Sequence, residues 1–336
     1  MNTAVPLTQI ASSPYDGTSV NATTSLEILS PPRDLRRGRA WPRTNAAASA
    51  EADRDAYIAD AVRALGAEGR TVAMVGAKGG VGTTTVALLA GALLAAVPEA
   101  RPALVELAAD WGATEHLLGS AENRTVADLL AHLTAAHRAG LGFVQRFLTP
   151  WERLPVLLAP RDPALVARLT AEDYRRTLRL LGEHYGLLFL DCGPSLTHPL
   201  TRFALDVADH VVLVTGPDPV ALHCTGAAIA YLTNPPPMTN RSSGPGLVDF
   251  PPVLPRTRAD LTVVLNGADH ANTHALDTTA GKEVMPPLNA VLTVPRSEPL
   301  RQQFAAGNAS VETLPTPIRR ALKTVLATVL RRLTHV

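Results

Sequence analysis

Residues Thr71 to Leu94 read TVAMVGAKGGVGTTTVALLAGALL and carry the strongest indication of the fold. It begins as an apolar run typical of a strand, continues as a glycine-rich loop and ends as an apolar run of helical length. Gly79, Gly80 and Gly82 let backbone N–H groups converge on an anion, and the following helix presents its positive N-terminal end to the same point. This order of strand, loop and helix predicts a cradle for the phosphate groups of a nucleotide.

Strand-like apolar runs alternate with helical patterns along the rest of the chain. The runs are Thr71–Gly76, Ala103–Leu107, Leu154–Ala159, Leu187–Asp191, His210–Thr215, Leu261–Asn266 and Asn289–Val294. Helical patterns between them include Thr84–Ala96, Thr170–Tyr185 and Val220–Leu232. Strands that are apolar almost throughout are buried on both faces, so the sequence predicts an α/β fold with a doubly wound, mostly parallel sheet and helices on both faces.

Two segments stand apart from this pattern. Residues 1–50 are rich in Pro, Ser, Thr and Arg without apolar periodicity, which is typical of a disordered tail. A helix is predicted from Ser49, and residues 51–336 are assigned to one nucleotide-binding domain. Residues at about 234–260 are rich in Pro and Gly, and we expect them to form a surface insertion within that domain.

Composition limits the function classes. The chain has 336 residues, is 46% hydrophobic and carries a formal charge of +1, so no overall field favours DNA, which we consider an improbable partner. The two cysteines provide no disulfide framework. The N-terminal stretch lacks the features of a secretory signal, and the longest apolar run, Val86–Val97, is shorter than the roughly 20 residues that cross a bilayer. We expect a cytoplasmic protein, with at most peripheral contact at the inner face of the membrane.

The loop resembles that of a known family. KGGVGTTT, residues 78–85, is similar to the deviant Walker A motif of the MinD/ParA superfamily, usually written KGGxGK[ST]. Lys78 matches the signature lysine, which in ATP-bound dimers of that family reaches the phosphates of the partner subunit. The resemblance implies ATP and Mg²⁺ as cofactors and a nucleotide-dependent homodimer. The implied nucleotide-binding residues of the loop are Lys78, Gly79, Gly80, Val81, Gly82, Thr83, Thr84 and Thr85.

Other parts of the chain resemble the family in the same order. YGLLFLDCGPSL resembles its second nucleotide-sensing motif, which places Asp191 near Mg²⁺ through water, while the hydroxyl of Thr84 is placed to bind the ion. VVLNG places Asn266 where the family contacts adenine, and VLTVPRSEPL resembles the segment around Pro295 that closes over the base.

The chain also departs from the family where hydrolysis is concerned. Thr83 stands at the position of the usual Walker lysine, which removes a positive charge from the phosphates. After the second strand the family has an Asp-x-Asp pair, whereas this chain has Glu106 and then Ala108, with Asp110 two residues further on. Lys78 and Glu106 remain the candidates for a catalytic role. Losing such groups commonly slows phosphoryl transfer by orders of magnitude, so we expect weak or absent hydrolysis.

These features favour an ATP-binding dimeric switch that positions or regulates a membrane-associated assembly. The loop resembles that of the CpaE/TadZ branch, which localises pilus assembly machinery, and MinD-like proteins that accompany type VII secretion systems are similar. Pilus or secretion proteins are therefore the expected partners. An active ParA/MinD-type ATPase for DNA partitioning or division-site placement and a nucleotide-free scaffold are the alternatives. An apolar stripe flanked by basic residues from Ile318 to Leu333 is expected to pack on the sheet, with contact to a membrane surface as the other interpretation.

Overall fold

A computed structural model describes residues 43–66, 69–107, 114–119, 124–235, 255–257, 260–269 and 291–334. The strands are β1 (Arg70–Gly76), β2 (Pro102–Glu106), β3 (Thr149–Trp151), β4 (Leu154–Leu157), β5 (Leu187–Asp191), β6 (His210–Thr215), β7 (Leu261–Ala268) and β8 (Val291–Pro295). The helices before β5 are α1 (Arg43–Leu65), α2 (Thr83–Ala95), α3 (Thr114–Leu118), α4 (Val126–Ala131), α5 (Leu133–Ala139), α6 (Leu141–Val144), the 3₁₀ helix η1 (Gln145–Phe147), α7 (Pro163–Val166) and α8 (Ala171–Gly182). Those after β5 are α9 (Pro199–Val207), α10 (Pro219–Thr233), α13 (Glu298–Ala305) and α14 (Thr316–Thr334).

The strands form one sheet in the order β3-β4-β2-β5-β1-β6-β7-β8. All neighbouring strands are parallel except the β3–β4 pair. The loop strand β1 is central, between β5 and β6, and the pairing sets Glu106 of β2 beside Asp191 of β5. Because the carboxyl ends of parallel strands meet at one edge, the glycine-rich loop and these two carboxylates are brought to the same edge of the sheet.

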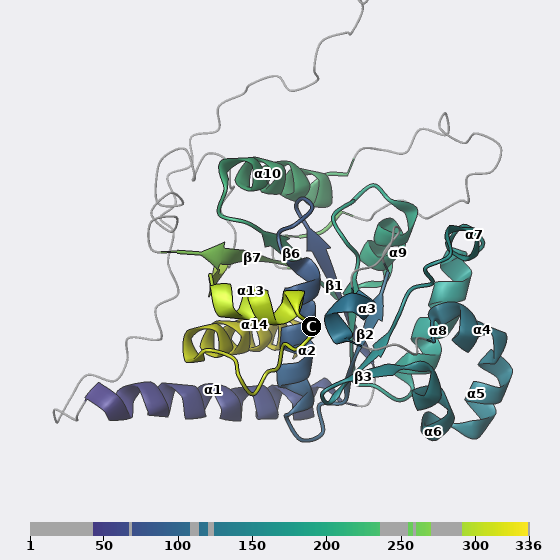
Figure 1. Ribbon diagram of the computed structural model, residues 1–336, viewed down its shortest axis with the longest axis horizontal. Coiled ribbons are helices and arrows are strands. Elements are labelled where there is room, and N and C mark those ends of the chain that lie inside the picture. The colour runs from purple at the N-terminus through teal and green to yellow at the C-terminus, as the bar shows by residue number, and fades with distance from the viewer. Residues whose placement is uncertain are drawn as a thin grey trace, which may run out of the picture. The chain divides into compact units, whose positions relative to one another are not determined.

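Two hydrophobic cores, one on each face of the sheet, hold the helices in place. Val72 and Met74 of β1 pack in a cluster with apolar residues of α1, α2, α13 and α14, whereas Ala73 and Val75 pack with those of α4, α5, α8, α9 and α10. Successive side chains of a strand point to opposite faces, so a fully apolar strand supplies both cores. Figure 1 shows α1, in purple, running beside α14 along one side of the molecule.

The predicted fold class is confirmed, with two differences in detail. Each predicted strand is present within a few residues, but the short edge strand β3 was not expected because Pro150 interrupts its pattern; an edge position tolerates the missing N–H. The first helix begins at Arg43 rather than Ser49, so it extends into the segment assigned to the tail. Residues 1–42 and most of the predicted insertion at 234–260 lie outside the described residues.

The C-terminal helix α14 packs on the sheet, as expected. Its apolar stripe, including Leu322, Leu326 and Leu330, is buried in the core shared with α2. The stripe is therefore not available to a bilayer in this structure. Within the described ranges, no helix has the length and apolar character needed to span a membrane.

His210, at the start of β6, makes folding stability depend on pH. It is 1% exposed and its Nε2 lies 2.9 Å from the Oγ1 atom of Thr262. Burial lowers the pKa of His210 from 6.5 to about 4, with further lowering from Arg332 and Arg256 against an opposing effect of Asp260. Below pH 6.5 the unfolded chain therefore takes up a proton that the folded chain does not accept until about pH 4.

We expect this histidine to remove ~3 kcal/mol from the free energy of unfolding as the pH falls from 7 to 4. Urea denaturation across this range should show a smaller loss for His210→Gln, because glutamine has no proton to take up. Other carboxylates titrate in both proteins, so the difference between the two curves is the measurement. Identical pH dependence would contradict the assignment.

Candidate functional site

The loop between β1 and α2 needs glycine at two positions. Gly80 and Gly82 have φ values of 80° and 85°, in the left-handed region that side chains rarely adopt. A Cβ atom added at Gly82 would lie 2.4 Å from the Nδ2 atom of Asn266, closer than real contacts allow. Gly82 also caps the N-terminus of α2, so the amides of the loop and of the first helical turn are open toward the same side.

Hydrogen bonds to residues of three strands, or directly after them, hold this loop. The Gly76 amide donates to the Gly193 carbonyl after β5 at 3.1 Å, and the Ala77 amide donates to the Val214 carbonyl of β6 at 2.9 Å. From β7, the Nδ2 atom of Asn266 donates to the Val81 carbonyl at 2.8 Å. These bonds fix the loop before any ligand binds. Because the loop is already ordered, binding a phosphate costs less conformational entropy.

A cavity of about 570 Å³ opens beside the loop and collects residues from distant parts of the sequence. The predicted site residues that line it are Lys78, Gly80, Val81, Gly82, Thr85, Asn266 and Pro295. Its inner wall is apolar, with Leu89 of α2, Phe304 of α13 and Leu322 of α14. A polar rim on an apolar pocket of this volume suits a nucleotide, whose base is flat and weakly polar and whose phosphates are charged.

Gly79, Thr83 and Thr84 belong to the same loop and first helical turn but do not line this cavity. Thr83 is buried, and its Oγ1 atom lies 2.7 Å from where a Cβ of Gly76 would stand, which places the hydroxyl under the loop. Thr83 itself brings no positive charge to the position of the usual Walker lysine. The cations that line the cavity are Lys78, Arg296 and Arg301.

Asp191 lies at the end of β5, 3% exposed, and its Oδ1 atom is buried with no hydrogen-bond partner among the residues that the structure describes. Burial raises the pKa of Asp191 to about 6, hydrogen bonds from Thr84 and the Gly193 backbone oppose this, and the charge of Glu106 adds to it. A buried carboxylate oxygen without a partner is rare in folded proteins. Together with the Thr84 hydroxyl it provides the oxygen chemistry that a hydrated Mg²⁺ ion prefers, so these residues fit the ion.

Glu106 sits beside Asp191 but is engaged elsewhere. It is 4% exposed, and its Oε2 atom accepts a hydrogen bond from the Ala159 amide at 3.1 Å. This bond turns a carboxylate oxygen toward β4 rather than toward the loop. Ala108 and Asp110 lie outside the described residues, so the absence of the usual second aspartate is known from the sequence alone.

Asp218 is a site residue that the sequence analysis missed. Its Oδ1 atom lies 3.4 Å from the Nζ atom of Lys78 and accepts a hydrogen bond from the Ala221 amide at 2.9 Å, which caps α10. That backbone bond, and then the charge of Lys78, holds the pKa of Asp218 below its usual range. The signal in the sequence was Asp218 followed by Pro219, a common start for a helix, immediately after a buried strand.

Comparison with solved structures shows which known fold this chain shares. A ParA family ATPase from Chlorobium tepidum TLS matches with a TM-score of 0.61 at 17% sequence identity, over 76% of this chain and 98% of that one. The septum site-determining protein MinD from Pyrococcus horikoshii OT3, complexed with Mg-ADP, matches with a TM-score of 0.54 at 19% identity, over 77% of this chain and 94% of that one. The chain has the MinD/ParA P-loop ATPase fold. Identities this low establish the MinD/ParA fold and leave the activity open.

Sequence comparison finds a relative among characterised proteins. The ESX-1 secretion-associated protein EspI of Mycobacterium tuberculosis is 30% identical over 167 residues, which cover 48% of this chain. The match covers 24% of the length of EspI, so the chain spans about a quarter of that relative. No family model matches the sequence.

Proposed function

We propose that the chain is an ATP-binding dimeric switch that positions or regulates a membrane-associated secretion assembly, with weak or absent hydrolysis. The observation that carries this proposal is the cavity that joins the glycine loop to Asn266 and Pro295 from the far end of the sheet. The similarity to a secretion-associated protein favours secretion over pilus assembly as the system served.

The residues present fit ATP with Mg²⁺. The amides of residues 79–82 and the start of α2 would hold the phosphates, and the apolar wall with Asn266 and Pro295 would hold the base. Thr84 and Asp191 would hold Mg²⁺, directly or through water. When bound, the ion would neutralise phosphate charge, a contribution that matters more here because Thr83 replaces a lysine.

The pairing of Lys78 with Asp218 suggests how the switch works. Both side chains are partly exposed, at 37% and 45%, and an ion pair of this kind is worth little. In the family that the loop resembles, this lysine reaches the phosphates of the partner subunit. A triphosphate held by a second copy would therefore compete with Asp218 for Lys78 and draw the two copies together.

The state of Glu106 supports weak hydrolysis. Its carboxylate is buried and bound to the Ala159 amide, so orienting a water molecule would require breaking that bond. The Walker position also lacks a charge because Thr83 fills it. Phosphoryl transfer depends on charge neutralisation and on a positioned water molecule, and both are reduced here.

Calorimetry with ATP and Mg²⁺, combined with light scattering, tests the proposal. We expect binding at submillimolar ATP and a doubling of mass that Lys78→Ala prevents, because alanine cannot reach the phosphates of a second copy. A phosphate-release assay should show little turnover. Absence of binding at millimolar ATP, or a mass that ATP does not change, would remove the switch.

Asp191→Asn is expected to weaken Mg²⁺-dependent nucleotide binding about 10- to 100-fold, since the amide cannot replace the charge that faces the ion. Binding measured with EDTA in place of Mg²⁺ should be nearly unaffected. Asp53→Asn, on the exposed side of α1, is the matched control because it removes the same charge at a distance. An equal loss with and without Mg²⁺ would refute the assigned role of Asp191.

A further inference from the structure

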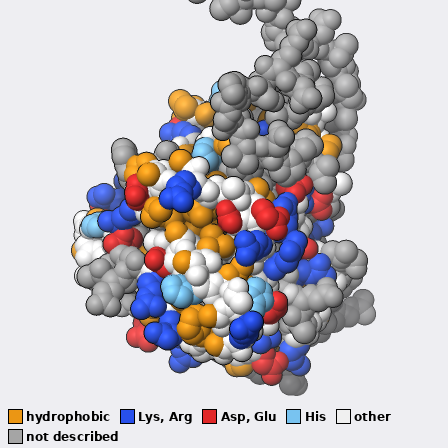
Figure 2. Space-filling model, turned by 90° about the vertical axis from the view of Figure 1, so that its right-hand side faces the viewer, with side chains coloured by type: hydrophobic (Ala, Val, Ile, Leu, Met, Phe, Trp, Pro, Cys, Tyr) orange, Lys and Arg blue, Asp and Glu red, His pale blue; other side chains and the backbone are white. Residues whose placement is uncertain are grey.

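A second cavity, of about 390 Å³, lies between α5 and α8. These helices pack on the sheet face opposite to α2, α13 and α14, so this groove is separate from the nucleotide cavity. It is lined by Leu133, Thr134, His137 and Arg138 of α5 and by Arg176 and Arg179 of α8. Figure 2 looks at this side of the molecule and shows basic and histidine side chains among apolar ones. We call it the arginine groove.

The three arginines of the groove have no ion pair within the described part of the chain. Arg138, Arg176 and Arg179 are all exposed, and none forms a salt bridge or side-chain hydrogen bond there. Arg176 and Arg179 are three residues apart on α8, so their side chains share one face of the helix. Three like charges held together without a counterion are unfavourable in the free protein and favour an anionic ligand.

Nearby carboxylates are occupied elsewhere. Asp128 accepts hydrogen bonds from the amide and hydroxyl of Thr125, and Asp173 does the same for Thr170. Glu172 is bound to Arg175 on the same helix. Of the carboxylates that the structure describes, Glu183 approaches the groove, with its Oε1 atom 3.9 Å from the Nε2 atom of His137.

The segment that contains the groove also has more arginines than acidic residues. Residues 124–183 contain nine arginines and six acidic residues, although the whole chain carries a formal charge of only +1. Two of the carboxylates are used as helix caps through Thr125 and Thr170. The positive charge is therefore concentrated on this part of the surface. The arginine groove is the hollow within that positive surface.

We propose that the arginine groove binds an acidic segment of a partner protein. Guanidinium groups recognise carboxylates through two parallel hydrogen bonds, which point charges such as lysine cannot make. The groove is a hollow between two helices, and a protruding side chain or chain segment can enter it. A flat bilayer follows the shape of such a hollow less closely than a chain segment does, so a membrane surface is the poorer match.

A nucleic acid also fits the groove less well. Backbone recognition of DNA requires a row of cations that follows many phosphates, and single strands require aromatic side chains for stacking. The groove offers three arginines within one short hollow, and the imidazole of His137 is the aromatic ring that the described residues bring to its lining. A few carboxylates on one segment match this size and charge.

Fluorescence anisotropy of a labelled oligoglutamate peptide with the full chain tests this proposal. We expect saturable binding that weakens at least about tenfold in Arg176→Gln/Arg179→Gln, because each guanidinium offers a charge-assisted pair. Glu183→Gln should bind the peptide more tightly, since it removes the carboxylate that lies beside His137 of the groove. The matched control is Arg63→Gln/Arg153→Gln, which removes the same charge at exposed positions outside the groove.

Each other outcome overturns the proposal. No saturable binding at millimolar peptide would remove it, and an equal loss in the control variant would reduce it to non-specific charge attraction. Tighter binding of duplex DNA, or of phosphatidylglycerol vesicles, that depends on Arg176 and Arg179 would assign the groove to those ligands instead. Displacement of the peptide by inorganic phosphate alone, at equal charge concentration, would identify a small-anion site. None of these binding measurements requires that the protein bind a nucleotide.

Discussion

Replacing Gly82 by valine is expected to weaken binding of ATP and Mg²⁺ at least about 100-fold, or about 3 kcal/mol. Gly82 has a φ of 85°, which costs a β-branched residue about 1–3 kcal/mol, and its Cβ would collide with Asn266 at 2.4 Å. The collision can be relieved only by moving the loop or by releasing the Asn266 amide from the Val81 carbonyl. Either change disturbs the amides that are meant to hold the phosphates.

A glycine elsewhere separates the folding cost from the binding cost. Gly140, between α5 and α6, has a similar φ of 73°, and a Cβ added there meets nothing within 4 Å. Gly140→Val should therefore lose stability to backbone strain alone and bind ATP as the native chain does. Calorimetry on both variants, with circular dichroism to confirm folding, is the measurement. Native affinity in Gly82→Val would mean that the loop does not hold the nucleotide.

The sequence could predict the sheet because its strands are apolar without interruption. VVLVT and TVVLN can be buried on both faces only in the middle of an α/β fold, and β5 and β6 have the predicted boundaries. β3 escaped prediction because three residues with Pro150 at the centre carry no strand signal. The loop was also predictable from its residues. Consecutive glycines between an apolar strand and an apolar helix are typical of a phosphate-binding loop.

Contacts between distant residues could not be predicted. Asn266 was expected to contact adenine, and it lines the cavity; that its side-chain amide also bonds to the Val81 carbonyl of the loop, 185 positions away along the chain, was not expected. The pair of Lys78 with Asp218 depends on β1 and β6 being neighbours in the sheet, which only the topology reveals. The same holds for Glu106, whose partner Ala159 follows β4.

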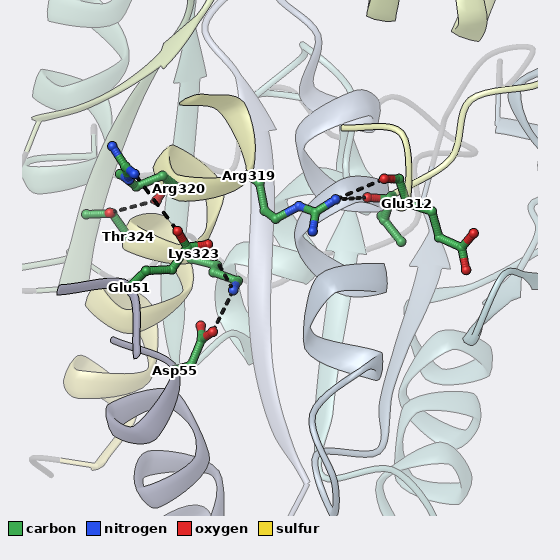
Figure 3. A network of polar contacts seen from close by, with 8 residues as sticks. Glu51, Asp55, Glu312, Arg319, Arg320, Lys323 and Thr324 are labelled. Atoms are coloured by element: carbon green, nitrogen blue, oxygen red, sulfur yellow. Dashed lines mark hydrogen bonds and ion pairs between the residues drawn. The ribbon is translucent and has the colours of Figure 1, made fainter. Parts of the chain in front are cut away.

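Helix α1 is the part of the described chain where the sequence was least informative. It lies against α14, where Lys323 pairs with Asp55 at 2.7 Å and with Glu51 at 3.6 Å, and Arg320 approaches Glu51 at 3.9 Å, as Figure 3 shows. Partly exposed ion pairs of this type contribute ~0–1 kcal/mol each. Burial of the apolar face of α1 should therefore dominate, and Ile58, at 2% exposed, is its most buried large side chain.

Ile58→Ala is expected to lower the free energy of unfolding by about 3–4 kcal/mol, because it leaves a cavity in the core that α1 shares with α14. Tyr57→Ala is the matched control: Tyr57 is adjacent and 38% exposed, so its loss should cost under about 1 kcal/mol. Since Leu322 of α14 lines the nucleotide cavity, Ile58→Ala should also weaken ATP binding modestly. Urea denaturation measures the first effect and calorimetry the second. Equal stability of the two variants would show that α1 is not part of the folded core.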